Sequence, residues 1–135
     1  MIRLLRMKDI SLKEFIEDGW KSQQEYAAAA GIIGPYDLAS KAERYQMIIN
    51  NIGHMIEETV EARREVVRRP WKVNEVGCLD SEEKRDAFIE EMFDVLLFFR
   101  ATLAYAGISG EEFIAAAAKK LKYNSEREDH SVNKT

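Results

Sequence analysis

The sequence predicts an all-α protein, a single domain over residues 1–135 with a four-helix bundle-like fold. Two observations lead to this class. At four places Ser or Asp is followed three residues later by Glu, the capping-box pattern with which helices begin. The four pairs are Ser11/Glu14, Ser40/Glu43, Asp80/Glu83 and Ser109/Glu112. The 135 residues also contain only two prolines and seven glycines, so little interrupts a helix after each cap.

Each cap is followed by apolar residues at helical spacing. This pattern predicts helices over about residues 11–30, 40–69, 81–106 and 109–124. Pro35 follows the first helix, Pro70 should end the second, and Gly107 suits the left-handed position after the third. The remaining segment, 124–135, has almost no apolar residue, and we expect it to form a polar, mobile tail.

The third predicted helix is apolar around nearly its whole circumference. Its apolar residues are Phe88, Ile89, Met92, Phe93, Val95, Leu96, Leu97, Phe98, Phe99 and Leu103. A helix of this kind is buried on all sides. Three other helices of a short chain can hardly cover it, so the sequence predicts homo-oligomerisation, as a homodimer or a homotetramer.

Composition excludes several kinds of partner. The net charge of -4 argues against a nucleic-acid-binding surface, which needs a basic excess. The apolar run Val95–Phe99 is far shorter than a bilayer-spanning helix, so no membrane partner is expected. Met1–Phe15 contains no continuous signal-peptide core, and Cys78 is the only cysteine. We therefore expect a cytoplasmic protein.

Two acidic pairs stand out, Glu58-x-x-Glu61 in the second predicted helix and Glu91-x-x-Asp94 in the third. A spacing of three places both carboxylates of a pair on one helix face, where they repel one another. An unpaired carboxylate on a buried helix costs several kcal/mol, so these acids need a partner. Four oxygen ligands without a cysteine favour Mg²⁺, with Mn²⁺ as a possible substitute.

Other interpretations of the acids exist. Arginines could pair with them, and four lie nearby: Arg63, Arg64, Arg68 and Arg69. The chain would then be a non-catalytic helical dimerisation module. A di-iron bundle would require Glu-x-x-His on two helices, and neither His54 nor His130 completes that motif.

With these residues the chain resembles the all-α nucleoside triphosphate pyrophosphohydrolases, the superfamily of MazG and the dimeric dUTPases. Their Glu-x-x-Glu and Glu-x-x-Asp motifs match Glu58, Glu61, Glu91 and Asp94. Trp71-Lys72 is similar to a Trp-Lys element of the dUTPase branch. The segment Lys120-x-x-x-Asn124-x-x-Arg127 is similar to that branch's Lys-x-x-x-Asn-x-x-Arg segment. The resemblance extends over about residues 45–130.

The resemblance implies Mg²⁺-dependent hydrolysis of a (deoxy)nucleoside triphosphate, with dUTP leading, to the monophosphate and pyrophosphate. It implies that the four acids hold the metal and that Glu61 is the catalytic base. The implied substrate-binding residues are Lys72, Lys120 and Arg127 for the phosphates, with Asn124, Gln24 and Trp71. The tail is then expected to order over the bound nucleotide.

Two departures leave the base open. Dimeric dUTPases often have His shortly after the second motif, where this chain has Leu97, and Ala27 stands where an Asn of the uracil pocket is expected. Gln23 or Gln24 could still contact the base. The alternative substrates are dCTP and modified deoxynucleoside triphosphates.

Overall fold

The computed structural model describes residues 9–37, 40–67 and 69–132, and side chains up to Arg127. These residues form the helices α2 (Leu12–Ala30), α3 (Lys41–Val66), α4 (Glu82–Tyr105) and α5 (Gly110–Val132), with a short 3-10 helix η2 (Pro35–Asp37). The described residues contain no strand, so the all-α prediction is confirmed. The predictions that concern residues 1–8, Arg68 and residues 133–135 lie outside this part of the chain.

The helix starts follow the capping-box pattern with one exception. The hydroxyl oxygens of Ser11, Ser40 and Ser109 each accept the backbone N–H three residues later. At α4, however, the cap is Ser81, whose hydroxyl accepts the Lys84 N–H at 3.0 Å, and the prediction of Asp80 was wrong by one residue. The Asp80 carboxylate instead accepts the Gly77 N–H at 2.9 Å, which stabilises the turn before the helix.

Two helix ends differ from the prediction. The second helix ends at Val66, before Pro70, because Val67 is already extended at φ −173°. The last helix is longer than predicted: α5 continues to Val132 and includes most of the segment assigned to a tail. No glycine or proline follows Gly110, and the polar residues there have adequate helix propensity, so the helix need not stop at residue 124.

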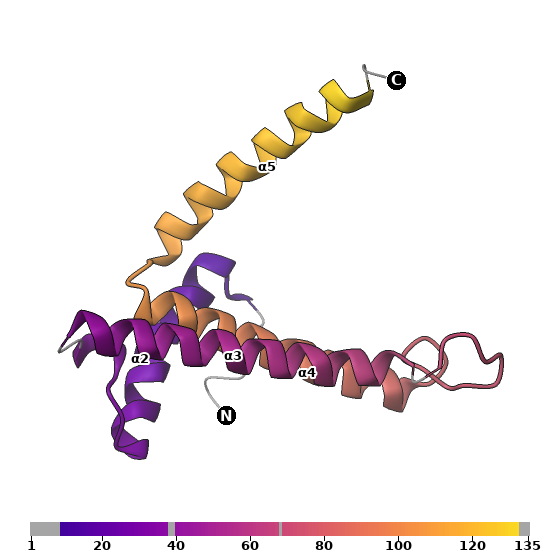
Figure 1. Ribbon diagram of the computed structural model, residues 1–135, viewed down its shortest axis with the longest axis horizontal. Coiled ribbons are helices and arrows are strands. Elements are labelled where there is room, and N and C mark those ends of the chain that lie inside the picture. Colours follow the sequence, from indigo (N-terminus) through magenta and orange to yellow (C-terminus); the bar gives the residue numbers. More distant parts are fainter. Residues whose placement is uncertain (1–8, 38–39, 68, 133–135) are drawn as a thin grey trace.

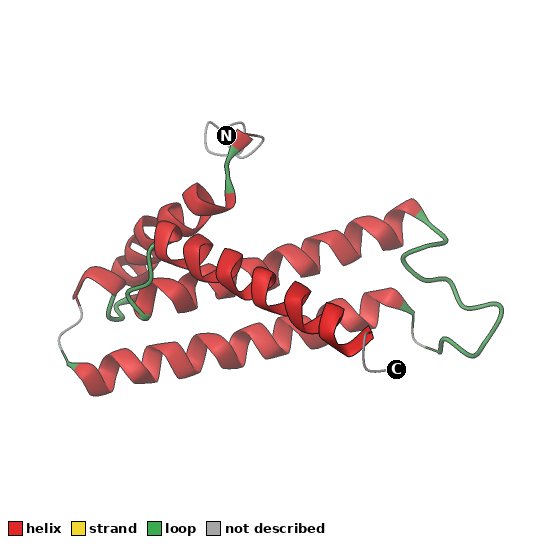
Figure 2. Cartoon of the chain, turned by 90° about the horizontal axis from the view of Figure 1, so that it is seen from above, coloured by secondary structure: helices red, strands yellow, loops and turns green. Residues whose placement is uncertain are grey.

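The helices α3 and α4 lie side by side and antiparallel, joined at one end by the loop 67–81 (Figures 1 and 2). Near the other end of this pair, α2 packs across α4. The start of α5 packs against α2, and α5 then rises away from the α3–α4 pair (Figure 1). The arrangement is therefore a long helical pair with α2 and α5 gathered at one end.

The buried core lies where α2 meets the last turns of α4. Phe15 and Ile16 of α2 are buried, as are Leu103, Ala104 and Tyr105 of α4. Along the rest of α4 the burial is incomplete: Ile89, Met92 and Leu96 are between 44% and 53% exposed. A single chain therefore leaves part of α4 uncovered, as expected from the sequence, and burial of that part by a second copy stays a prediction.

Among the described residues, no single helix is both long enough and apolar enough to cross a membrane. Taken together, α4 and residues 110–127 of α5 have the required length and apolar character, but they are separated by a bend of 108°.

Candidate functional site

The antiparallel packing of α3 and α4 brings the predicted acids together. Carboxylate oxygens of Glu58, Glu61 and Glu91 all lie within 4.8 Å of one another. Asp94, one turn after Glu91, falls outside this group of three, but it is close enough for its charge to act on Glu58 and Glu91. Two motifs that are thirty residues apart in sequence thus form one acidic cluster, defined as these four residues.

Two oxygens of the cluster are buried without a donor. Oε2 of Glu58 and Oε2 of Glu91 are shielded from solvent and have no hydrogen-bond partner. In the part of the chain that the structure describes, none of the four acids makes a salt bridge with Lys, Arg or His. Pairing by arginine, the alternative interpretation of these acids, therefore receives no support from Arg63, Arg64 or Arg69. Buried polar atoms are nearly always satisfied, so these two oxygens require a proton, a water molecule or a cation as partner.

The acids perturb one another. Burial raises the pKa of the Glu58 carboxyl above its ordinary value, and the charge and close approach of Glu61 raise it further. Burial and the neighbouring Glu61 also raise the pKa of Glu91, while its contact with Glu58 acts in the opposite direction. A close contact between two carboxyl groups requires a proton on one of them or a cation between them. The mutual repulsion of the acids thus favours uptake of either a proton or a cation.

The donor set determines which ion fits. The three clustered side chains offer only carboxylate oxygens, which hard divalent cations such as Mg²⁺ and Mn²⁺ prefer. The nearest described histidine in sequence, His54, packs its ring on Phe98 with centroids 5.2 Å apart. It contributes no ligand to the group of three, so the di-iron pattern stays unsupported. The acids present therefore fit Mg²⁺ or Mn²⁺.

A pocket of about 470 Å³ lies between α2, α3 and α4. Its lining includes Gln23, Asn51, His54, Leu97 and Phe98. On α3, His54 is one turn before Glu58, and on α4, Leu97 is one turn after Asp94. The pocket and the acidic cluster are thus neighbours along the same two helices.

Sequence reasoning missed most of this pocket. The signal was present, because Asn51, His54, Glu58 and Glu61 follow one another at spacings of three and four, which places them on one face of α3. A polar stripe of that kind on a helix that packs against an apolar partner is unusual. This stripe joins the pocket residues of α3 to its two residues of the acidic cluster.

Gln24, a predicted substrate-binding residue, is engaged elsewhere. Its Nε2 donates to Oδ2 of Asp37 at 2.6 Å, and its Oε1 accepts the Tyr36 N–H at 2.9 Å. These bonds hold η2 against α2, so both ends of the amide serve the fold. The glutamine that lines the pocket is the preceding residue, Gln23.

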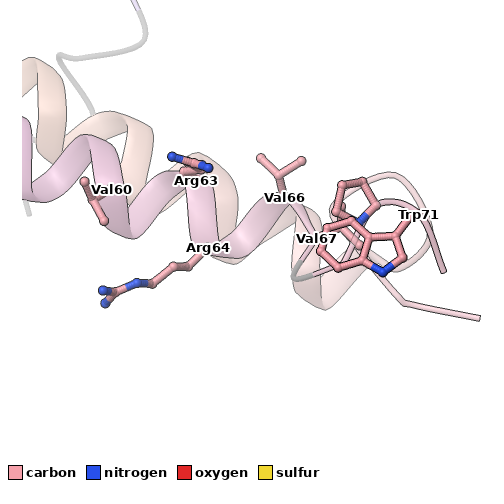
Figure 3. A pocket seen from close by; sticks show the side chains of 7 residues that line it. Val60, Arg63, Arg64, Val66, Val67 and Trp71 are labelled. Carbon is pink, nitrogen blue, oxygen red and sulfur yellow. The ribbon is translucent and has the colours of Figure 1, made fainter.

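Trp71 and Lys72 lie in the loop after α3. Trp71 is 74% exposed and lines a second pocket, of about 820 Å³, together with Arg63, Arg64 and Val67. Figure 3 shows Trp71 beside Val67, with the two arginines further back along α3 on different sides of the helix. Among the described residues, none of the four acids lines this pocket. Its exposure shows that Trp71 is not part of the buried core.

The predicted residues of the last helix stand apart from the cluster. Lys120 and Arg127 are exposed, and Asn124 is half-buried. They lie from the middle of α5 onward, in the part that leads away from α3 and α4 (Figure 1). A single chain therefore gathers the acids and the pocket, but not the predicted phosphate-binding residues of α5.

Compared with protein-family models, with curated proteins and with solved structures, the chain matches none of them.

Proposed function

We propose that the protein is a Mg²⁺-dependent nucleoside triphosphate pyrophosphohydrolase, with dUTP as the leading substrate. One observation carries this proposal: the buried, donorless oxygens of Glu58 and Glu91 belong to a carboxylate cluster that adjoins a pocket of about 470 Å³. An acidic cluster beside a mostly apolar pocket suits a ligand whose anionic end is held through a cation and whose other end is a ring system. The sequence resemblance through Trp71-Lys72 and Lys120/Asn124/Arg127 supports the same class of ligand.

In this proposal the acidic cluster holds the metal and the pocket holds the nucleoside. Bound Mg²⁺ would neutralise phosphate charge and lower the pKa of a water molecule. Glu61 is the most exposed of the three clustered carboxylates, which suits a base that meets water from the solvent side. It would accept a proton as the water oxygen bonds to the α-phosphorus. The bond from the α-phosphorus to the bridging oxygen breaks, which releases pyrophosphate and leaves the monophosphate.

A second copy of the chain is part of the proposal. Large apolar side chains on one face of α3 are between 39% and 61% exposed, and they recur at spacings of three and four. They are Tyr45, Ile49, Ile52, Ile56 and Val60. The chain exposes 10364 Å², whereas a folded monomer of 15.6 kDa exposes about 7,200 Å². The excess of about 3,000 Å² is ample for an interface, which needs about 800 Å² from each partner.

Such an assembly, a homodimer or a homotetramer, would also explain why α5 leads away from the acids of its own chain. The polar residues Lys120, Asn124 and Arg127 lead away from the acids of their own chain. In an oligomer they are available to the acids of a neighbouring copy. Phosphate contacts from Lys and Arg would stabilise the negative charge that develops on the leaving group.

The same exposed face of α3 favours a second candidate, a non-catalytic helical dimerisation module. The two candidates differ in what the acidic cluster does. The enzyme should gain thermal stability from millimolar Mg²⁺ with a non-hydrolysable nucleotide, because ligands that bind only the folded state stabilise it by mass action. The dimerisation module should melt at the same temperature with and without them.

The direct test is a panel of nucleoside triphosphates that includes dUTP, dCTP and a modified deoxynucleotide, assayed with Mg²⁺ for pyrophosphate release. Glu61→Gln and Asp94→Asn should abolish release while the helical circular dichroism signal stays. Glu90→Gln is the matched control, since Glu90 is an exposed acid on α4 next to Glu91. Release that persists in both cluster variants, or that is absent for the whole panel, contradicts the proposal.

A further inference from the structure

The two ends of α3 lie beside pockets of opposite charge. At the C-terminal end, the charged residues that line the pocket of about 820 Å³ in the described part of the chain are Arg63 and Arg64. At the N-terminal end, a pocket of about 530 Å³ lies where residues 31–37 meet the start of α3. Its charged lining residues are Asp37 and Glu43. The helix thus has a basic pocket at one end and an acidic pocket at the other.

The exposed apolar face of α3 joins the two pockets. It consists of Tyr45, Ile49, Ile52, Ile56 and Val60, and Val60 also lines the basic pocket. If two copies pack through this face with their α3 helices antiparallel, each basic pocket comes beside an acidic pocket, and the two helix dipoles oppose one another. A parallel pair would instead place like charges together at both ends, which is costly at an interface. Charge therefore favours the antiparallel arrangement.

An antiparallel pair related by a two-fold axis has a defined register. The apolar face extends from Tyr45 to Val60, so its midpoint lies close to Ile52. Residues equally distant from that midpoint face one another across a two-fold interface. Tyr45 therefore meets Val60 of the second copy, Ile49 meets Ile56, and Ile52 meets its own equivalent.

The charged groups lie on matching sides of the apolar face. Gln46 of the acidic pocket and Arg64 of the basic pocket are about five helical turns apart, so both lie on one side of α3. The two-fold axis keeps that side in common, which brings Arg64 of one copy beside the acidic pocket of the other. Among the described residues, neither Arg64 nor Glu43 makes a salt bridge within its own chain. Both charges are therefore available for a contact between copies.

We propose that a second copy docks on α3 in the antiparallel register, with Arg64 of each copy paired with Glu43 of the other and Trp71 packed against the other's acidic pocket. Trp71 is 74% exposed and lines the basic pocket just after the end of α3. In this register it comes beside the segment that precedes α3 in the second copy. That segment contributes Ile32 and Ile33 to the acidic pocket, so an apolar surface meets the indole ring.

This contact also reaches the candidate site. Ile32 and Met47 line both the acidic pocket and the pocket of about 470 Å³ that is proposed to hold the nucleoside. Trp71 of the second copy thus packs on a wall that the two pockets share. The inference rests on the oligomer in the proposed function and not on the reaction.

Crosslinking in solution tests the register. Two full-length chains with different tags, one with Tyr45→Cys and one with Val60→Cys, are co-expressed in a Cys78→Ser background. A short bis-maleimide should link the two different chains and should link neither variant to itself, because like positions are about 22 Å apart along the helices. Ile52→Cys alone should link to itself, which shows that the reagent reaches the interface. Links between two Tyr45→Cys chains, or none between the two variants, would overturn the register.

A charge exchange tests the ion pair. Arg64→Glu and Glu43→Arg should each weaken association by about 30-fold in analytical ultracentrifugation, because like charges then meet across the interface. The double variant should associate within about three-fold of the wild type, since the pair is restored with reversed sign. The control combines Glu43→Arg with Lys21→Glu, which reverses an exposed charge on α2 and should restore nothing. Absence of rescue by the double variant would overturn the pairing of Arg64 with Glu43.

Replacing the indole ring tests the docked loop. Trp71→Ala should weaken association by about 30-fold or more, as loss of an aromatic anchor does. Val73→Ala changes a side chain of the same loop that is 99% exposed, and it should have no effect. Association that is insensitive to Trp71→Ala, or a wild-type chain that stays monomeric, would contradict the docking. A dimer with the expected crosslinks that releases no pyrophosphate would contradict the proposed reaction alone, whereas hydrolysis by an assembly with other crosslinks would contradict only this interface.

Discussion

Removing one acid from the cluster should stabilise the metal-free protein. Most substitutions destabilise a fold, so this sign is distinctive. Glu58 and Glu61 place carboxylate oxygens within 4.8 Å of each other. At that distance two unit charges repel by about 0.9 kcal/mol in water and by about 3.5 kcal/mol at an effective dielectric constant of 20. Glu61 is exposed, so solvent screening selects the lower end, and Glu61→Gln should add about 1 kcal/mol of stability.

The measurement is thermal unfolding at pH 8 and low ionic strength, in EDTA and in Mg²⁺. For a chain of this size about 1 kcal/mol corresponds to an increase in Tm of about 4 °C. In EDTA, Glu61→Gln should therefore melt above the wild type. In Mg²⁺ at about one hundred times its Kd, the wild type should gain about 2.7 kcal/mol and the variant clearly less.

The control is Glu90→Gln, which neutralises an exposed acid on α4 outside the cluster. It should change Tm little in either buffer and keep the full response to Mg²⁺. A Glu61→Gln protein that melts below the wild type in EDTA would refute the electrostatic reasoning. One that responds to Mg²⁺ as strongly as the wild type would refute the metal assignment.

Three further predictions concern the cluster, the oligomer and the pocket. The pKa values of Glu58 and Glu91 are raised in the folded state, so the folded protein binds more protons than the unfolded chain. The Tm in EDTA should therefore rise as the pH is lowered from 7 toward about 5, and saturating Mg²⁺ should weaken that rise. Ile56→Asp should produce monomers in light scattering after size exclusion, whereas Val73→Asp in the exposed loop after α3 should not; a wild type that is already monomeric would contradict the interface. Gln24→Ala removes two hydrogen bonds to η2, so the free energy of unfolding in chemical denaturation should fall by about 1–2 kcal/mol while KM stays unchanged. A large rise in KM would instead indicate that Gln24 contacts the substrate.

The sequence was sufficient for elements with local causes. The serine caps of α2, α3 and α5 and the left-handed Gly107 depend on residues a few positions apart. The error at α4 shows the limit of this reasoning. Asp80 and Ser81 both satisfy a cap pattern, and the choice between them was made by the turn bond from Gly77 to Asp80. Such a bond depends on the path of the loop, which a capping pattern does not contain.

The candidate site also has one part that local sequence patterns predict and another that depends on contacts between distant segments. Helical spacing was enough to predict that Glu58 shares a face with Glu61, and the packing of α3 against α4 added Glu91. The direction of α5 after Gly110 could not be predicted, because it depends on how tightly the start of α5 packs on α2. A Cβ atom at Gly110 would lie 2.2 Å from the Lys13 carbonyl oxygen, so the two helices meet there backbone to backbone. Contacts between distant segments of that kind have no local signature.

The burial of Tyr105 has an evolutionary consequence. One hydroxyl group completes the interior of the fold and also bonds to the pocket residue Gln23, so a substitution there alters the core and the pocket together. Replacing Tyr105 to alter the pocket would destabilise the whole domain. Residues at the pocket margin such as His54, whose side chain is 54% exposed, are free of that constraint. Divergence among descendants of this chain should therefore accumulate at the margin first, with Tyr105 among the last positions to change.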